Sequence, residues 1–147
     1  AEYCAEVAPA LWPSDRIARA HARSIAAEMH AGFRALRMAM PMNIGRIFPG
    51  RSRTPECLAD IARVEAIWAE AIAASGGPFL FGRAFGAADA MYAPVVTRFR
   101  TWQPEIGAAT RAYCDAVRAH PLVAQWHRDA EAEPAEWLLD KYENPVS

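Results

Sequence analysis

Apolar side chains recur at helical spacing in the first third of the chain. They are separated by four, four, three and four residues, at Ile25, Met29, Phe33, Leu36 and Met40. Side chains at this spacing share one face of an α-helix. Ser14 and Asp15 precede the pattern as helix-starting residues, and Pro41 follows it. The pattern predicts one helix of about 26 residues from Ser14 to Met40, with a bend at Gly32.

A second amphipathic pattern follows a loop. Residues 41–53 contain two prolines and two glycines, which interrupt both helical and strand periodicity. Thr54 and Pro55 then supply a cap residue and a proline at the first helical position. We expect helices over residues 55–74, 87–101, 108–120 and 121–132. The first two helices of the chain are expected to pack antiparallel through Phe33, Leu36, Leu58, Ile61 and Trp68.

The composition fits a single all-α domain. The 147 residues are 53% hydrophobic, and alternating runs of β-branched residues are missing. We therefore predict an all-α bundle of about five to six helices, with the tail from residue 133 to 147 packed on it. The tail residues expected to make that contact are Trp137, Leu138, Leu139 and Tyr142.

Charge and cysteine content narrow the classes of function. The 16 basic and 17 acidic side chains give a net charge of −1, which provides no basic surface for nucleic acid or an anionic membrane. No apolar run approaches the roughly 20 residues that span a bilayer, and the first residues lack a basic targeting segment. The three cysteines form no C-x-x-C pair. We expect a cytoplasmic protein that binds neither nucleic acid nor membranes.

No motif in the chain indicates self-contained catalysis. The four histidines include no pair at i, i+4 spacing, so no metal site is expected. A nucleophile elbow, a phosphate-binding loop and a dinucleotide-binding turn are all missing from the sequence. The acid-rich residues 129–136 are typical of a solvated helix end. The sequence therefore predicts no catalytic residue and no metal ligand.

The segment from residue 27 to 38 is a candidate pocket wall. Helical spacing places His30, Arg34 and Arg37 on one face, beside Phe33 and Met38. A titratable imidazole and guanidinium groups next to apolar side chains can line a binding site. The alternative is that His30 is a surface histidine and that the methionines fill the core.

A second segment, residues 79–94, has the layout of a helix start. Asp89 lies three residues after Gly86, and Phe85 precedes that glycine, as in a capping box joined to a hydrophobic staple. Gly86 can cap only through its backbone, whereas the Asp89 carboxylate can accept a hydrogen bond from the Gly86 N–H. We assign Gly86 and Asp89 a structural capping role.

Four segments together resemble the C-terminal helical domain of bacterial glutathione S-transferases. They are Leu11-Trp12-Pro13, residues 27–33, Pro41-Met42-Asn43, and Phe79-Leu80-Phe81-Gly82 leading to residues 88–94. The likeness covers residues 1–137 and implies that residues 11–147 form this helical domain. Residues 1–10 then resemble the end of the last helix of a preceding thioredoxin-like domain and a linker. The rest of that domain would be missing from this chain.

Individual positions agree with the family pattern to different degrees. Glu28 and His30 match the stretch with which bacterial members reach glutathione and the second substrate. Ala31 stands where a basic residue is frequent in the family, and Gly86 stands where the family has serine or threonine. Asp89 keeps the family pattern.

The resemblance implies the electrophile-binding and dimerisation domain of an enzyme that conjugates glutathione to apolar electrophiles. Glutathione would be the co-substrate, bound mainly by the thioredoxin-like domain, and no metal is implied. The first two helices would face a second copy in a homodimer, and this chain alone would be inactive. The expected substrate-binding residues are Glu28, His30, Phe33, Arg37, Met38, Met42, Tyr92 and Val96.

Two other interpretations stay open at the level of sequence. Helical domains of this type also resemble non-catalytic protein–protein interaction modules in translation and synthetase assemblies. A stand-alone helical binding protein, unrelated to thiol chemistry, is the third possibility. Resemblance of fold alone does not separate these functions.

Overall fold

The computed structural model describes residues 1–145, and this part of the chain is helical without a β-strand. The predicted all-α class is therefore confirmed. Its helices are α1 (Glu2–Val7), α2 (Arg16–Ala31), α3 (Arg34–Ala39), α4 (Pro55–Ser75), α5 (Ala87–Trp102), α6 (Ala108–Ala119), α7 (Pro121–Glu131) and α8 (Asp140–Glu143).

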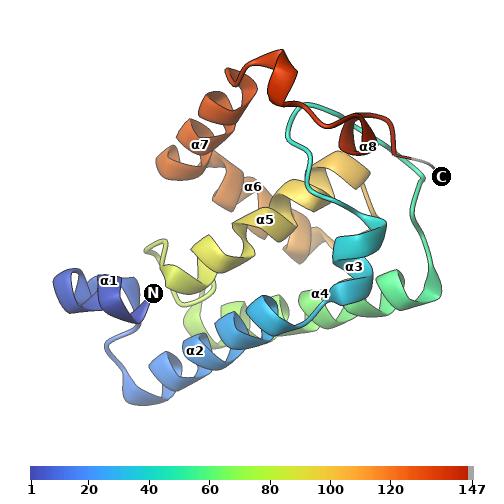
Figure 1. Ribbon diagram of the computed structural model, residues 1–147. Coiled ribbons are helices and arrows are strands. Elements are labelled where there is room, and N and C mark those ends of the chain that lie inside the picture. The colour runs from blue at the N-terminus through green and yellow to red at the C-terminus, as the bar shows by residue number, and fades with distance from the viewer. Residues whose placement is uncertain (146–147) are drawn as a thin grey trace.

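Helix α5 runs through the middle of the molecule, and the other long helices surround it (Figure 1). Helix α2 packs on α5, α3 packs on α4, and α6 packs on α4, α5 and α7. Helices α2 and α4 run antiparallel, and one ion pair and one histidine–carboxylate contact join them. Arg63 Nε lies 2.8 Å from Glu28 Oε1, and His21 Nε2 lies 4.0 Å from Glu70 Oε1.

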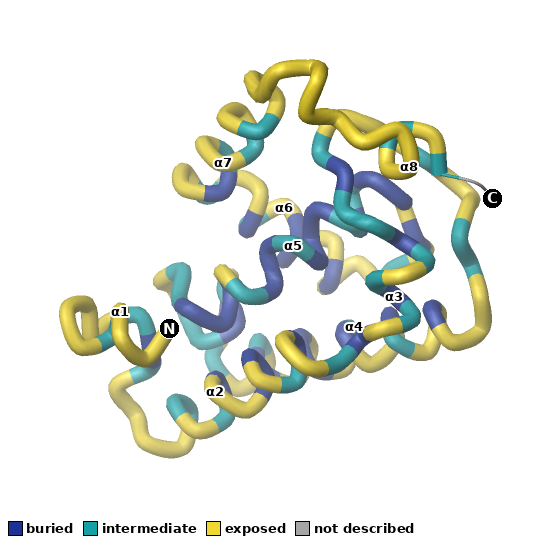
Figure 2. Tube along the Cα trace, viewed as in Figure 1, coloured by how far each residue is buried: buried dark blue, intermediate teal, exposed yellow. Residues whose placement is uncertain are grey.

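A cluster of buried aromatic side chains lies where α4, α5 and α6 meet. Trp68 of α4 is fully buried, and its ring lies 5.5 Å from Tyr92, 5.7 Å from Phe99 and 4.6 Å from Tyr113. Figure 2 shows the consequence along the chain, because α5 is buried over most of its length whereas α1 and the segment around α8 are exposed. Aromatic packing of this kind favours edge and tilted arrangements.

The prediction of one helix from Ser14 to Met40 is wrong, because the chain breaks at Gly32 and Phe33. Helix α2 begins at Arg16, where the Asp15 carboxylate accepts a hydrogen bond from Ala18 N at 2.8 Å. It ends at Ala31, and at the next residue, Gly32, an added Cβ would lie 2.7 Å from the Glu28 carbonyl oxygen. Phe33 then adopts the left-handed conformation with φ of 57° and buries its side chain. Helix α3 starts in a new direction.

The expected packing of the first two helices is correct in part. Leu36, Ile61 and Trp68 are buried as expected, and Phe33 is buried at the junction of α2 and α3. Leu58 is 45% exposed and lies outside the core, which contradicts its predicted role. The contact with α4 is made mainly by the short helix α3, since the break releases α2 to pack on α5.

The other predicted helices are confirmed to within one residue at each end. Thr54 caps α4 by accepting a hydrogen bond from Cys57 N at 3.2 Å, and residues 41–53 form the expected loop. The predicted apolar packing of the tail is wrong for Trp137, Leu138 and Leu139. Each of these side chains is more than half exposed, so the tail lies on the molecule through other contacts.

Candidate functional site

The start of α5 is organised around a buried carboxylate. Asp89 Oδ1 accepts hydrogen bonds from Leu80 N and from the Tyr113 hydroxyl, both at 3.0 Å, and Oδ2 accepts one from Gly86 N at 2.9 Å. Burial raises the pKa of Asp89, although the hydrogen bonds from Leu80 and Gly86 act in the opposite direction. This acid joins the loop before α5 to α6, and its oxygens face protein donors.

Three of the proposed substrate-binding residues lie in the core. Phe33, Tyr92 and Val96 are almost completely buried. The Tyr92 hydroxyl donates a hydrogen bond to the Ile25 carbonyl oxygen at 3.2 Å, and burial raises the pKa of the phenol. Val96 borders a different hollow, which lies between α5 and α6. These side chains hold helices together and do not line one common pocket.

Two further residues of that set lie on the surface of α2. The Glu28 carboxylate is held by both Nε and Nη2 of Arg63, at 2.8 and 2.9 Å, and this pairing lowers the pKa of Glu28. His30 is exposed in the last turn of the helix. Neither Glu28 nor His30 lines a hollow together with Met38 and Met42.

The remaining three residues, Arg37, Met38 and Met42, do come together. They line an open cavity of about 460 Å³ between α3, α5 and α8. Sequence reasoning missed Arg98, Lys141 and Tyr142, because they come from helices distant in the chain. The further lining residues are Ala39, Pro41, Ser52, Arg98, Lys141, Tyr142 and Pro145.

Arg98 is the most deeply placed cation of this cavity. Its Nε donates a hydrogen bond to the Met40 carbonyl oxygen at 2.9 Å, and Nη1 donates one to the Pro94 carbonyl oxygen at 3.2 Å. Burial, together with the nearby charge of Arg37, lowers the pKa of Arg98 to about 10. The guanidinium thus ties the end of α3 to α5.

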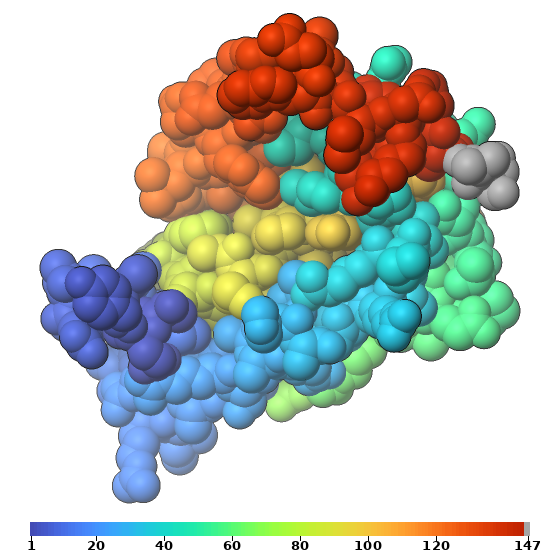
Figure 3. Space-filling model, in the orientation of Figure 1, coloured from blue at the N-terminus to red at the C-terminus, as the bar shows by residue number. Residues whose placement is uncertain are grey.

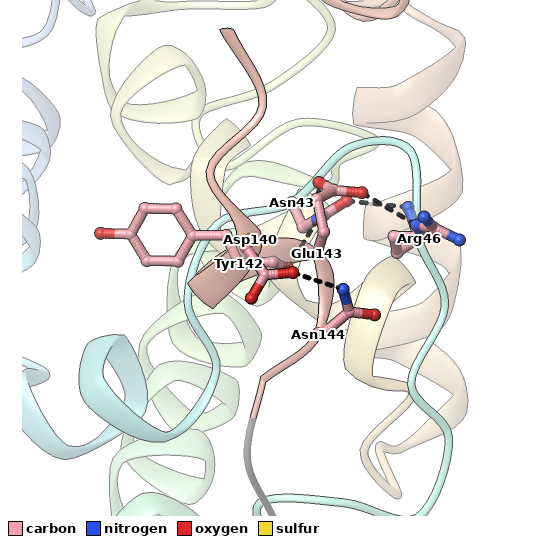
Figure 4. A network of polar contacts seen from close by, with 6 residues as sticks. All are labelled: Asn43, Arg46, Asp140, Tyr142, Glu143 and Asn144. Carbon is pink, nitrogen blue, oxygen red and sulfur yellow. Dashed lines mark hydrogen bonds and ion pairs between the residues drawn. The ribbon is translucent and has the colours of Figure 1, made fainter. Parts of the chain in front are cut away.

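The C-terminal segment is held over this region by polar contacts. The Asn43 amide donates hydrogen bonds to the Tyr142 carbonyl oxygen at 2.9 Å and to Glu143 Oε1 at 2.8 Å. Arg46 Nε donates one to Glu143 Oε2 at 2.8 Å. Figure 4 shows the Tyr142 ring extending away from these contacts, and that ring borders the cavity. The 42–46 loop therefore fixes where α8 lies.

A second hollow lies beneath the tail. It measures about 470 Å³, and it is bordered by the 42–46 loop, the end of α7 and the segment from Trp137 to Leu139. In the space-filling view the tail arches over that loop (Figure 3). Met42 and Tyr142 border both hollows, so the two share a wall.

Comparison with protein families identifies the helical framework around the site. A family model described as glutathione S-transferase, C-terminal domain, matches residues 50–129, more than half of the chain. The chain belongs to this glutathione S-transferase C-terminal domain family. No curated protein matches the chain.

The matched residues of this glutathione S-transferase C-terminal domain include α4 to α6 and most of α7, and with them Asp89 and Arg98. Arg37, Met38 and Met42 precede the matched segment, and Lys141 follows it. The cavity is therefore built partly on the family framework and partly on segments outside the match.

The described part of the glutathione S-transferase C-terminal domain contains neither a candidate metal-binding site nor a membrane-spanning helix. Residues 1–145 contain no group of three or more histidine, cysteine or acidic side chains placed to bind a metal ion. In the same range, no helix combines the length and the apolar character needed to cross a membrane.

Proposed function

We propose that this domain holds the electrophilic second substrate of a glutathione-conjugating enzyme. The observation that supports it is the cavity between α3, α5 and α8, where Met38 and Met42 lie beside Tyr142. Glutathione would be bound mainly by the thioredoxin-like domain that the family resemblance implies. Holding the electrophile near the thiolate makes the attack effectively intramolecular, which is a large source of rate acceleration.

In this proposal the domain positions the electrophile and does not supply the nucleophile. Cys57 and Cys114 are buried, and burial raises the pKa of both thiols, that of Cys114 to about 12. A thiol with a raised pKa is rarely ionised at neutral pH and reacts slowly. Cys4 is exposed, but it lies in α1 and does not line the cavity. The activated thiol would therefore be that of glutathione.

The first test is whether Met38 and Met42 bind a neutral aromatic compound. The 147-residue chain, labelled with ¹³C at its methionine methyl groups, is titrated with nitrobenzene and followed by NMR. We expect the Met38 and Met42 signals to move, while Met91, which borders none of the described hollows, stays in place. Movement of the Met91 signal alone, or of none, would contradict the proposed site.

A second measurement tests the division of roles. With glutathione and 1-chloro-2,4-dinitrobenzene, the 147-residue chain is expected to give no rate above the uncatalysed reaction. The control is the same assay with an enzyme that joins this domain to a thioredoxin-like domain. Conjugation by the 147-residue chain itself would overturn the proposal that the thiolate comes from outside it.

We also propose a homodimer formed through α2 and α4. Support comes from the family resemblance and from the partial exposure of Leu58 on α4. Light scattering of the chain should report two copies, and Leu58→Glu should shift the population towards monomer while Arg83→Gln should not. A monomer at all concentrations would remove this part of the proposal.

The alternative is a non-catalytic protein–protein interaction module. Its support is the exposed apolar tail, where Trp137, Leu138 and Leu139 lie in sequence. Under this alternative nitrobenzene leaves Met38 and Met42 unchanged, so the NMR titration separates the two functions.

A further inference from the structure

The charges around the Met38 and Met42 cavity are of one sign. Arg37, Arg98 and Lys141 line it, and none of the described lining residues is acidic. The nearest acids in sequence, on α8, are engaged elsewhere. Glu143 pairs with Arg46, and Asp140 accepts a hydrogen bond from Asn144 Nδ2 at 2.7 Å. Among residues 1–145, the lining of the cavity thus carries three cationic side chains and no acidic one.

Arg98 shows this imbalance most clearly. Its protein partners are the carbonyl oxygens of Met40 and Pro94 and the Met42 sulfur, all of which are uncharged. Within the described residues no carboxylate lies within 4.0 Å of it, and Nη2 donates no hydrogen bond. Nη2 is also not sealed from solvent. Placing a charge away from water without a counter-ion is unfavourable, so an anion in the cavity would relieve the cost.

Arg37 and Lys141, the other two cations that line the cavity, also have a donor group or a charge that no described residue pairs with. Arg37 uses Nε and Nη2 on the carbonyl oxygens of Gly32, Met29 and His30 at the end of α2. Its Nη1 donates no hydrogen bond to a described residue. Lys141 Nζ lies 4.6 Å from the centre of the Tyr142 ring, a cation–π contact that leaves its charge uncompensated.

Apolar side chains line the cavity beside these cations, which restricts the kind of anion. Met38, Met42 and Pro41 offer apolar contacts on the side of α3 and the loop, and the Tyr142 ring does so on the side of α8. A ligand that fits both features has an apolar body and one anionic group. The planar guanidinium of Arg98 matches the planar geometry of a carboxylate.

We propose that this cavity selects organic carboxylates, with the carboxylate against Arg98 and Lys141 and the apolar body against Met38 and Met42. This inference rests on the proposed substrate-binding function and specifies its substrate class: electrophiles that carry a carboxylate. Arg37 contributes long-range attraction, since most of its donors already cap α2.

The test compares two ligands that differ only in charge. The chain with ¹³C-labelled methionine methyls is titrated with 4-phenylbutyrate and with 4-phenyl-1-butanol, and separately with inorganic phosphate. We expect both organic ligands to move the Met38 and Met42 signals, with the carboxylate binding about tenfold more tightly. Phosphate should bind much more weakly than the carboxylate, because it makes no apolar contact.

Variants then assign the preference to named charges. Lys141 is exposed and makes no hydrogen bond or ion pair with a described residue, so Lys141→Gln should leave folding intact. This variant should bind 4-phenylbutyrate roughly threefold more weakly and should bind 4-phenyl-1-butanol with unchanged affinity. Arg98→Gln should remove most of the preference, and the buried Met29 signal reports whether that variant folds. Arg83→Gln, an exposed cation outside the cavity, is the matched control and should change nothing.

Three other results of the titrations would each contradict a different part of the proposal. Equal affinity for the acid and the alcohol would overturn the selection of carboxylates and leave the apolar pocket standing. Failure of both ligands to move Met38 and Met42 would overturn the pocket itself and with it the proposed function. Phosphate binding as tight as that of 4-phenylbutyrate would make this a site for small inorganic anions. If Arg98→Gln does not fold, unchanged binding by Lys141→Gln overturns the proposal.

Discussion

Helix α5 carries two ionisable groups of opposite sign, the buried carboxylate of Asp89 and the half-buried guanidinium of Arg98, and their surroundings differ. Asp89 near its start accepts hydrogen bonds from three donors, which come from Leu80, Gly86 and Tyr113. Arg98, further along, lines the cavity, meets only neutral acceptors within the described residues and has no hydrogen bond from Nη2. A completed polar network fixes how the chain folds, whereas an incomplete one at a cavity leaves a place for a ligand.

The largest effect is expected from removing the completed network. Asp89→Ala leaves the Leu80 and Gly86 N–H groups and the Tyr113 hydroxyl without their acceptor in the core. We expect a loss of about 1–3 kcal/mol in the free energy of unfolding, measured by urea denaturation. Arg98→Met is the matched comparison at the other charge and should cost less, because an apolar side chain of similar length replaces an uncompensated cation. Equal losses for both variants would remove the distinction between the two sites.

A smaller and local effect is expected from releasing the tail. Glu143→Ala removes the ion pair with Arg46 and one hydrogen bond from Asn43. The loss should be about 1 kcal/mol, confined to α8 because few buried contacts hold that helix. Hydrogen exchange is expected to quicken at the amides of residues 142–144 and to stay unchanged in α4 and α5. Faster exchange throughout α5 would mean that the tail supports the core, contrary to the comparison.

The smallest effect concerns pH, where two acids should behave in opposite ways. Burial raises the pKa of Asp89, so the folded protein binds its proton more tightly than the unfolded chain does. Its contribution to stability therefore declines as pH rises from 3.8 through the folded pKa. Pairing with Arg63 lowers the pKa of Glu28, whose contribution is present above pH 4.5 and is lost as pH falls through its folded pKa.

Carboxyl ¹³C NMR titration measures both pKa values directly. The Asp89 signal should titrate above 3.8 and the Glu28 signal below 4.5. Asp89→Asn and Glu28→Gln identify the signals and remove each contribution from the pH dependence of unfolding. The Glu28 contribution should stay within about 0.5 kcal/mol, since the pair is partly exposed. A Glu28 pKa above 4.5 would contradict the ion pair.

The helices after the loop were predictable because local residues mark their ends. Thr54 and Pro55 start α4, and the Thr54 side chain makes the capping hydrogen bond. The pattern at Gly86 and Asp89 places the start of α5. Signals of this kind lie within a few residues of one another and need no tertiary structure.

The break between α2 and α3 was not predictable from apolar spacing. Met29, Phe33 and Leu36 are all buried, so the stripe continues across the break as it would along one helix. A single left-handed residue, Phe33, changes the direction of the chain without changing this pattern. Gly32 marks the place of the break, as the expected bend there did, because a Cβ at this position would lie 2.7 Å from the Glu28 carbonyl oxygen.

The cavity was predictable only on one side. Arg37, Met38 and Met42 were found because they are close in sequence to a recognisable segment. Arg98 has no local signal, since one arginine in a helix is ordinary, and Lys141 reaches the site only after the tail folds back. Spacing in the sequence cannot show which distant side chains share a cavity.

The hydrogen bond from Asn43 to the Tyr142 carbonyl joins residues 99 positions apart, and this has a consequence for biosynthesis. Chains emerge from the ribosome with the N-terminal part first, so α2 to α6 can pack before Tyr142 has been added. The core would then form ahead of the cavity wall that α8 supplies. A message truncated before Asp140 should still yield a folded core, but one whose cavity has lost a side and two of its lining residues, Lys141 and Tyr142.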